Sequence, residues 1–219
     1  MLRPMADARA AVLLPVKAFS RAKHRLAPVL DPPERAALAR TMATIVARAA
    51  APLPVAVVCD DEEVAGWAGS IGAEVVWCPG RGLNGAVGDA VGHLASSGVA
   101  RVVVAHADLP LATGLAALAP GHGVTLVPDR RDDGTNVLVV PAASGFRFAY
   151  GPGSFGRHLL EAARLDLEAH VVRDRRLAWD VDVPADLDTP ADPDRPADLD
   201  LPAELRRLLL VAPRPAPRP

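Results

Sequence analysis

The stretch AAVLLPVKAFSRAKHRLA, residues 10–27, decides the fold class of this chain. Its first part, residues 10–16, is a short apolar run, which predicts a buried strand. The residues that follow predict a loop that carries Lys17, Lys23 and two arginines. In an open parallel sheet, ligands bind beyond the carboxyl ends of the strands. The stretch therefore indicates the first strand of an α/β sheet and a cationic loop at its ligand-binding edge.

Strands and helices alternate downstream of this loop. Asp31 is expected to cap a helix, because two prolines follow in the first turn and Glu34 is the third residue after the cap. This helix keeps apolar spacing through Ala50. Further strands are predicted at 55–59, 73–77 and 101–105, and further helices at 62–71 and 84–97, the latter capped by Asn84. The alternation predicts a mostly parallel α/β sheet with right-handed crossovers.

The second half of the chain has a different rhythm. After a short helix near 114–118, strands are predicted at 124–127, 136–140 and 146–150, with a polar turn at 129–134. A helix at 154–165 and a strand at 169–172 follow. Because strand–turn–strand pairs replace the alternation here, we expect a few antiparallel strands at one edge of the sheet.

The C-terminal end differs in composition, since nine of the 22 prolines follow Val183. One amphipathic helix is predicted over 200–210, and the end of the chain at 212–219 is expected to be disordered. We therefore expect a folded domain over 1–190 and a proline-rich, partly disordered extension over 191–219.

Composition excludes several classes of protein. Apolar residues make up 50% of the 219 residues and charged residues 23%, which is a globular balance. The formal net charge of −2 argues against a nucleic-acid partner. The apolar runs are too short to span a bilayer, and no signal-peptide stretch precedes the first strand. Two cysteines are too few for a disulfide framework, so a cytoplasmic location is expected. Because the apolar runs are short, no membrane partner is expected.

Only two of the 24 basic residues are lysines, and both, Lys17 and Lys23, lie in the cationic loop. A lysine ammonium is a compact charge that suits a phosphate oxygen, whereas an arginine guanidinium is a planar fork. The contrast indicates phosphate chemistry in this loop. The alternative is a solvated loop in which two lysines fall by chance.

Acidic side chains follow several predicted strands. Asp108, beyond the strand at 101–105, is a candidate Mg²⁺ ligand because this cation prefers oxygen donors; the alternative is a cap on the next turn. Asp180 and Asp182 alternate, so an extended segment would place both carboxylates on one face, where they suit a divalent cation. The alternative is a solvated strand end. Asp60 also follows a strand, and we expect these groups to converge at one sheet edge.

The sequence GPGSFG at 151–156 formally matches the GxGxxG fingerprint of dinucleotide binding. Its late position, the short strand before it and Pro152, which lacks a backbone donor, oppose that interpretation. A simpler one is an anion held by free N–H groups at a helix N-terminus together with Ser154. Thr135 opens an earlier strand and is expected to face the same anion. A nicotinamide oxidoreductase stays open as an alternative.

Several short segments, taken in order, resemble the guanylyltransferases of coenzyme F-420 biosynthesis. They are LPVK at 14–17, RAKHRLA at 21–27, ERAAL at 34–38, GLN at 82–84, ADLP at 107–110, GTN at 134–136, FRF at 146–148, GPGSF at 151–155 and DVD at 180–182. That family transfers GMP from GTP to 2-phospho-L-lactate or phosphoenolpyruvate. The chain departs from its pattern at His106, where a proline is usual, and at Val183, which lacks a hydroxyl.

The resemblance implies a single-domain, Rossmann-like three-layer α/β/α sandwich with a nucleotidyltransferase fold similar to the molybdenum-cofactor guanylyltransferases. It implies GTP and a small phosphorylated acid as substrates, with Mg²⁺ as the cofactor. By position, the implied GTP-binding residues are Lys17, Lys23, Arg25, Asp60, Gly82 and Asn84, the acceptor-binding residues are Thr135, Gly151 and Ser154, and the metal ligands are Asp108 with Asp180 or Asp182. The expected catalytic residues are Lys17, Lys23, Arg25 and Asp108.

The implied reaction needs no general base, because the acceptor phosphate is already an anion. In-line positioning and neutralisation of charge around the α-phosphorus would carry the reaction. A molybdopterin acceptor and a non-catalytic nucleotide-binding module stay open as alternatives. The sequence does not separate phosphoenolpyruvate, phospholactate and phosphoglycerate as acceptors, and it predicts no oligomeric state.

Overall fold

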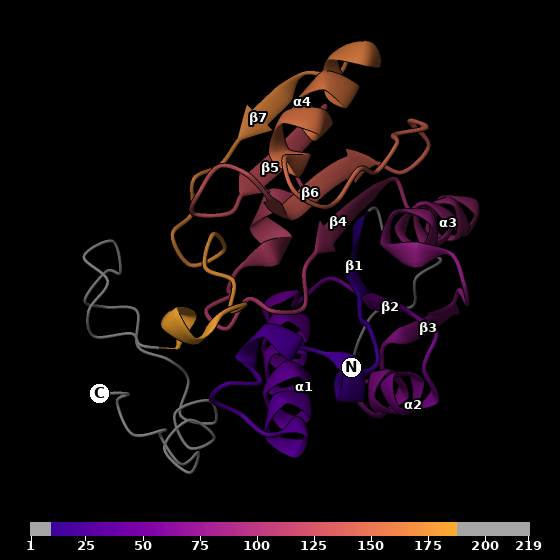
Figure 1. Cartoon of the computed structure of the whole chain (residues 1–219). Coiled ribbons are helices and arrows are strands. Elements are labelled where there is room, and N and C mark those ends of the chain that lie inside the picture. Colours follow the sequence, from indigo (N-terminus) through magenta and orange to yellow (C-terminus); the bar gives the residue numbers. More distant parts are fainter. Residues whose placement is uncertain (1–9, 188–219) are drawn as a thin grey trace.

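A seven-stranded sheet with the strand order β3-β2-β1-β4-β6-β5-β7 forms the centre of the computed structural model, which describes residues 10–187 (Figure 1). The strands are β1 (Ala10–Pro15), β2 (Val55–Cys59), β3 (Glu74–Trp77), β4 (Arg101–Ala105), β5 (Val124–Pro128), β6 (Thr135–Pro141) and β7 (Ala169–Val171). The helices are α1 (Pro32–Ala49), α2 (Glu62–Ser70), α3 (Gly82–Ser96) and α4 (Ser154–Arg164), with short 3-10 turns η2 (Phe19–Arg21), η3 (His24–Leu26), η4 (Leu115–Leu118) and η5 (Pro184–Asp186).

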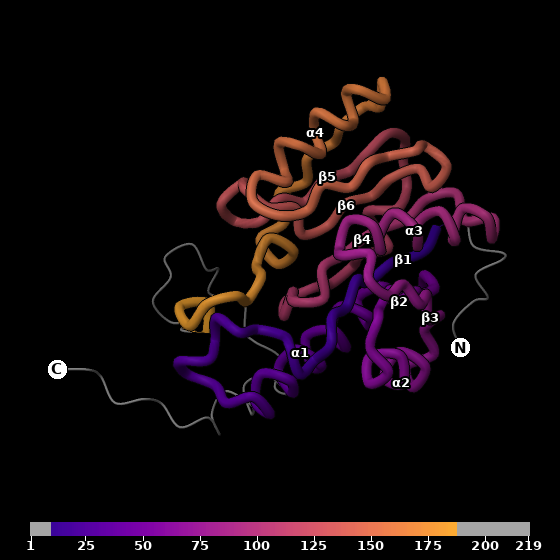
Figure 2. The backbone as a smooth tube through the Cα atoms, turned by 45° about the vertical axis from the view of Figure 1, so that its right-hand side comes forward, coloured from indigo at the N-terminus to yellow at the C-terminus, as the bar shows by residue number. Residues whose placement is uncertain are grey.

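Helices cover both faces of the sheet, which confirms the three-layer α/β/α sandwich. Val46 of α1 and Trp67 of α2 belong to one hydrophobic cluster with alternate residues of the central strands. Leu94 of α3 and Ala162 of α4 belong to a second cluster with the residues that face the other way. Figures 1 and 2 show α1 and α2 on one side of the sheet and α3 and α4 on the other.

The N-terminal half of the sheet is parallel, as the alternating pattern predicts. Strand β1 pairs in parallel with β2 and with β4, and β2 pairs in parallel with β3. The expected cap of α1 is confirmed as a capping box: Asp31 Oδ1 accepts from the Glu34 backbone N–H at 2.8 Å, and Glu34 Oε2 accepts from that of Asp31 at 2.7 Å. Because β1, β2, β3 and β4 are parallel, their carboxyl ends lie at the same edge of the sheet.

Strand β6 runs against both of its neighbours. It pairs antiparallel with β4 and with β5, whereas the edge strand β7 pairs in parallel with β5. The antiparallel pairing thus falls in the half of the chain where it is expected, but inside the sheet and not at its edge. Because β6 is reversed, it begins where β1 and β4 end, and His106 N donates to Asn136 O at 2.9 Å at this point.

Two local predictions are wrong. Residues 146–150 form no strand, and Asn84 does not cap α3, which begins at Gly82 with Arg81 as its N-cap. One contact accounts for both. Asn84 Oδ1 accepts from the Tyr150 backbone N–H at 2.6 Å, and Asn84 Nδ2 donates to the Tyr150 carbonyl at 3.3 Å. The side-chain amide therefore satisfies the backbone groups that a neighbouring strand would otherwise bind.

Two expectations concern residues outside the described part of the chain. The domain boundary at 190 and the extension over 191–219, with its helix at 200–210, lie beyond residue 187. Among residues 10–187, no helix is both long and apolar enough to cross a membrane.

Candidate active site

A pocket of about 530 Å³ opens beyond the carboxyl ends of the parallel strands; we call it the large pocket. Its polar and charged lining includes Lys17, Arg21, Lys23, His24, Arg25, Asp60, His106, Asp108 and Asp182, and Gly82 and Leu83 line it from the start of α3. The expected convergence of the cationic loop with the strand ends is therefore what the structure shows. Asn84 does not line this pocket, since its amide is bound to Tyr150.

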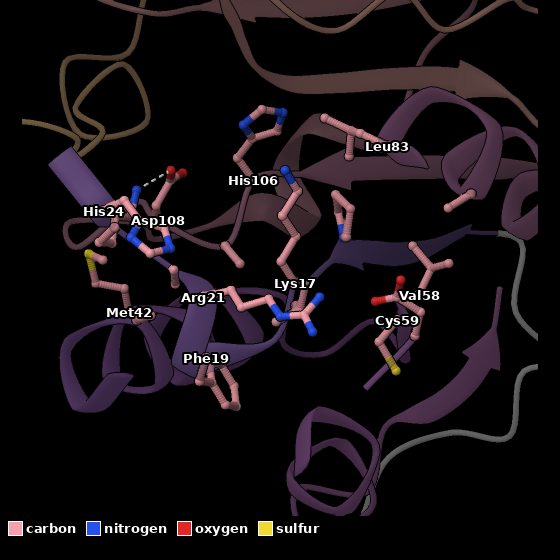
Figure 3. Close-up of a pocket in the computed structure, with 18 of the residues that line it drawn as sticks. Lys17, Phe19, Arg21, His24, Met42, Val58, Cys59, Leu83, His106 and Asp108 are labelled. Carbon is pink, nitrogen blue, oxygen red and sulfur yellow. Dashed lines mark hydrogen bonds and ion pairs between the residues drawn. The ribbon is translucent and has the colours of Figure 1, made fainter. Parts of the chain in front are cut away.

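The cationic loop wraps one side of the large pocket because η2 and η3 fold it back toward the strand ends. Phe19 of η2 is buried against Trp67 of α2, which anchors the loop. In Figure 3, the side chain of Lys17 extends between His106 and Leu83. Lys17 itself is exposed and is therefore accessible to a ligand in this pocket.

Lys23 bridges two of the expected metal ligands. Its Nζ donates to Asp108 Oδ2 at 2.6 Å and to Asp182 Oδ1 at 2.8 Å, and its side chain is only 9% exposed. Burial opposes the charge on Lys23, but the two carboxylates outweigh burial and raise its pKa. Burial would likewise raise the pKa of Asp108, and the Lys23 ammonium lowers it instead. Both groups are therefore ionised at neutral pH.

The carboxylates around Lys23 fit a divalent cation. Asp108 Oδ1 is buried and has no hydrogen-bond partner among the described residues. Burial, with a further contribution from the negative charges of Asp108 and Asp182, raises the pKa of Asp180 to about 6. Within residues 10–187, no three His, Cys, Asp or Glu side chains group closely enough to hold a metal ion by themselves. Mg²⁺ commonly takes one or two carboxylates and completes its shell with water and phosphate oxygens.

A second pocket of about 280 Å³, the small pocket, lies beside the first. It holds Thr135, Gly151 and Ser154, the three expected acceptor-binding residues, together with Asp180. Residues that line both pockets are Arg25, His106, Asp108 and Asp182. The two pockets therefore meet at the carboxylates that bind Lys23.

The expected nest of free N–H groups at the start of α4 is wrong. Gly153 N donates to Asp133 Oδ1 at 3.1 Å, Ser154 N to the Gly151 carbonyl at 3.0 Å, and Phe155 N to the Asp133 carbonyl at 3.0 Å. Asp133, in the turn at 129–134, accepts two of these bonds, and the Gly151 carbonyl accepts the third. Ser154 Oγ donates to Thr135 Oγ1 at 3.4 Å, so the Thr135 hydroxyl is the more available donor on this side of the pocket.

Sequence reasoning missed Asp186, which shapes the segment that carries Asp182. Its Oδ2 accepts from the backbone N–H groups of Asp182 at 2.6 Å and Val183 at 2.8 Å, and its Oδ1 pairs with Arg130. Asp186 is 4% exposed. A signal was present, since a proline followed two residues later by an aspartate is typical of a helix start.

Sequence reasoning also missed His158, a fully buried residue of α4 that contacts Thr135. Burial, with smaller effects of Arg157 and His106, lowers its pKa to about 4, so its ring is neutral. No local signal identifies it, because its partners come from distant parts of the sequence.

Comparison with known proteins identifies relatives of this chain. Residues 10–189 match the family described as "Guanylyl transferase CofC like". The chain is 35% identical over 182 residues to the phosphoenolpyruvate guanylyltransferase of Sphaerobacter thermophilus, which covers 79% of this chain and 88% of that protein. It is 34% identical over 179 residues to the 2-phospho-L-lactate guanylyltransferase of Methanothermobacter thermautotrophicus, with 78% of each chain covered.

Solved structures support the fold. A nucleotide-diphospho-sugar transferase from Desulfovibrio desulfuricans G20 matches with a TM-score of 0.74 at 18% identity, covering 93% of this chain and 94% of that one. A nucleotidyl transferase from Methanothermobacter thermautotrophicus matches with a TM-score of 0.54 at 16% identity, covering 81% and 93%. At sequence identities this low, these structural matches support only the fold. The family match spans all of the described residues, and the chain belongs to the CofC-like guanylyltransferases.

Proposed function

We propose that this chain transfers GMP from GTP to the phosphate of phosphoenolpyruvate, or of 2-phospho-L-lactate, and releases pyrophosphate. The observation that carries the proposal is the pair of pockets that share Arg25, His106, Asp108 and Asp182. A two-substrate transfer needs two binding sites that meet where the bond forms. The activities for which the two relatives are named support both acceptors. A role in coenzyme F-420 biosynthesis and a cytoplasmic location are part of this proposal.

GTP is assigned to the large pocket, which is about twice the volume of the small one. Lys17, Lys23 and Arg25 would hold the triphosphate from the cationic loop. Gly82 and Asp60 would contact the nucleoside on the opposite side. Asn84 stays a proposed GTP contact, through backbone atoms, because its amide already binds Tyr150.

The acceptor is assigned to the small pocket. Thr135 offers a hydroxyl donor, Ser154 lines the pocket and donates to Thr135, and Gly151, with φ of 120°, has no Cβ and allows a ligand to approach the backbone. Arg25 lines both pockets, so its guanidinium can reach an anion in either. A small phosphorylated acid fits such a site by charge and by size.

The transfer then follows from charge and position. An oxygen of the acceptor phosphate forms a bond to the α-phosphorus of GTP, and the bond from that phosphorus to the bridging β-oxygen breaks. The electron pair leaves with pyrophosphate, and the product is a diphosphate diester. The attacking oxygen is already an anion, so no residue has to remove a proton. The residues shared by the two pockets would align the two phosphates.

Asp108 and Asp182 would hold Mg²⁺, as nucleotidyltransferases generally use a divalent cation. The ion would neutralise charge on the phosphate oxygens around the reacting phosphorus. Lys23 now lies between the two carboxylates, so it would release them to the ion and turn to the triphosphate. Asp180 faces the small pocket and would act as a third carboxylate at longer range.

The test is a panel of acceptors incubated with GTP and MgCl₂. Phosphoenolpyruvate, 2-phospho-L-lactate, 3-phosphoglycerate and molybdopterin are each supplied, pyrophosphate is measured, and products are identified by mass spectrometry. Pyrophosphate release with a product of GMP-plus-acceptor mass for one of the first two supports the proposal. Turnover with molybdopterin alone would reassign the acceptor. No turnover, with GTP binding retained, would favour a non-catalytic nucleotide-binding module.

A nicotinamide oxidoreductase has lost its structural support. The GxGxxG fingerprint requires a strand directly before the glycines, and residues 146–150 form none. Titration with NAD⁺ and NADP⁺ checks this exclusion, and no binding is expected.

A further inference from the structure

His158 lies in α4 beneath the small pocket, with both of its ring nitrogens hydrogen-bonded. Nδ1 is 3.0 Å from Thr135 Oγ1, and Nε2 is 3.0 Å from the backbone nitrogen of Ala149. The ring also packs edge-on against Tyr150, with a centroid separation of 4.9 Å. Residue 158 therefore joins the acceptor-binding Thr135 to the segment that precedes Gly151.

These contacts fix the tautomer of the ring. A backbone N–H can only donate, so Nε2 must accept from Ala149 and carries no proton. A neutral imidazole then carries its proton on Nδ1, which donates to Thr135 Oγ1. Burial keeps the ring neutral, since the pKa of His158 is lowered to about 4.

The tautomer decides what the Thr135 hydroxyl can do. Its oxygen accepts from His158 Nδ1 and, at 3.4 Å, from Ser154 Oγ. A hydroxyl oxygen has two lone pairs and one proton, so with His158 and Ser154 both donating to it the Thr135 hydroxyl keeps its proton for a third partner. Thr135 lines the small pocket, and the proton is directed to what binds there.

We propose that His158 is a positioning residue for acceptor binding, which makes the Thr135 hydroxyl an obligatory hydrogen-bond donor to the phosphate or carboxylate of the acceptor. This rests on the proposed assignment of the acceptor to the small pocket. The backbone N–H groups of Gly153, Ser154 and Phe155 are occupied within the protein, and Ser154 Oγ donates to Thr135, which favours the Thr135 hydroxyl as the donor that recognises the anion. An oriented donor to an anion is stronger than a neutral hydrogen bond.

Two substitutions separate this role from a structural one. In His158→Asn, the amide nitrogen replaces Nδ1 and can donate to Thr135, but nothing replaces Nε2. In His158→Gln, the amide oxygen replaces Nε2 and can accept from Ala149, but nothing replaces Nδ1. Thr135→Val removes the hydroxyl. Steady-state KM and kcat for GTP and for phosphoenolpyruvate are measured for the wild type and each variant.

We expect His158→Gln and Thr135→Val to raise the KM for phosphoenolpyruvate about tenfold with little change in the KM for GTP, and His158→Asn to raise it less than threefold. The double variant His158→Gln/Thr135→Val should match Thr135→Val alone, because the two act through one hydrogen bond. The opposite order, with Gln near wild type and Asn impaired, would show that His158 only anchors Ala149 and would overturn the proposal.

A measurement on the wild type tests the same point without any substitution. Nitrogen-15 NMR of the histidine rings reports which nitrogen of His158 carries the proton. A proton on Nδ1 is expected, and a proton on Nε2 would overturn the proposal even if the variants fail to fold. If the wild type turns over no acceptor at all, the proposed function is wrong. If the wild type is active and His158→Gln has the same kinetics, the proposed role of His158 alone is wrong.

Discussion

The large and small pockets differ in how they are built. Contiguous loops beyond β1, β2 and β4 line most of the large pocket, with the start of α3 completing it. The small pocket draws on the turn at 129–134, the start of the reversed strand β6, the start of α4 and the segment at 180–186. The first is a property of the parallel half of the sheet, and the second depends on how later segments fold against it.

This difference in construction matches the proposed binding of a different substrate in each pocket. Strand ends in an open parallel sheet form a nucleotide site with few special requirements. The small pocket, by contrast, is held by specific side-chain contacts, such as Asp186 to the backbone of Asp182 and His158 to Thr135. We infer that substitutions in the large pocket change nucleotide use, that those in the small pocket change acceptor use, and that the shared residues affect both.

The largest effect is expected where the pockets meet. Asp108→Asn keeps the shape of the side chain and removes the charge that would hold Mg²⁺ and pair with Lys23. We expect kcat to fall on the order of a thousandfold, which is about 4 kcal/mol of barrier. Pyrophosphate release at saturating GTP and acceptor measures it.

Asp166→Asn is the matched control. Asp166 is exposed, lies outside both pockets and has φ of 52°, a conformation that asparagine tolerates. Its activity should equal that of the wild type. Full activity in Asp108→Asn would mean that Asp108 only shapes the turn beyond β4.

The two lysines of the chain allow a second comparison, because both line the large pocket, but Lys23 is largely buried and ion-paired whereas Lys17 is exposed. Lys23→Ala leaves Asp108 and Asp182 without their shared cation. We expect its free energy of unfolding to fall by about 2 kcal/mol, between the values for exposed and for buried ion pairs, because Lys23 is largely buried but the Asp182 side chain is 46% exposed. Thermal unfolding with and without MgCl₂ is the measurement, and Mg²⁺ should restore more stability to Lys23→Ala than to the wild type.

Lys17→Ala is the partner experiment. Lys17 is exposed, so its removal should weaken GTP binding while the unfolding temperature stays within about 1 °C of the wild type. If Lys17→Ala and Lys23→Ala lose the same stability, the ion pairs of Lys23 contribute nothing to the fold.

Sequence reasoning succeeds where the determinants are local. The strand at 55–59, the Asp31 cap and the cationic loop each follow from a few adjacent residues, and the structure confirms them. It fails at Asn84 and at 146–150, because one side-chain amide there satisfies the backbone of a residue 66 positions away. Two of the free donors expected at α4, the N–H groups of Gly153 and Phe155, are lost for the same reason, since both bind Asp133 from a distant part of the sequence.

The acceptor side gives a smaller effect that is confined to one substrate. Ser154→Ala removes a buried hydroxyl that donates to Thr135 and lines the small pocket. We expect the KM for phosphoenolpyruvate to rise about fivefold and the KM for GTP to stay unchanged, as for the loss of one hydrogen bond. Gly151→Val should raise it further, because a side chain there would block the ligand.

Ser96→Ala controls for the loss of a hydroxyl. Ser96 is exposed on α3, and its Oγ donates to the Gly92 carbonyl, away from both pockets. Its kinetics should match the wild type. If Ser154→Ala instead raised the KM for GTP alone, the substrates would have to be assigned to the opposite pockets.

The smallest effect is on the pH dependence of stability, and it comes from Asp180, which lines the small pocket but not the large one. The pKa of Asp180 is raised from 3.8 to about 6, so the folded chain binds more protons than the unfolded one between these values. Asp180 therefore favours folding below pH 4, and this contribution is lost as pH rises through 6. Asparagine at position 180 stays neutral, so the free energy of unfolding of Asp180→Asn should exceed that of the wild type by about 1 kcal/mol at pH 7.5 and should equal it at pH 4.

His158, with its pKa of about 4, changes the free energy of unfolding with pH in the opposite direction over the same range. It is present in both proteins, so its effect cancels in their difference. Urea unfolding of both at the two pH values measures the gap, and a gap that does not change with pH would show that burial and the neighbouring Asp108 and Asp182 do not raise the pKa of Asp180.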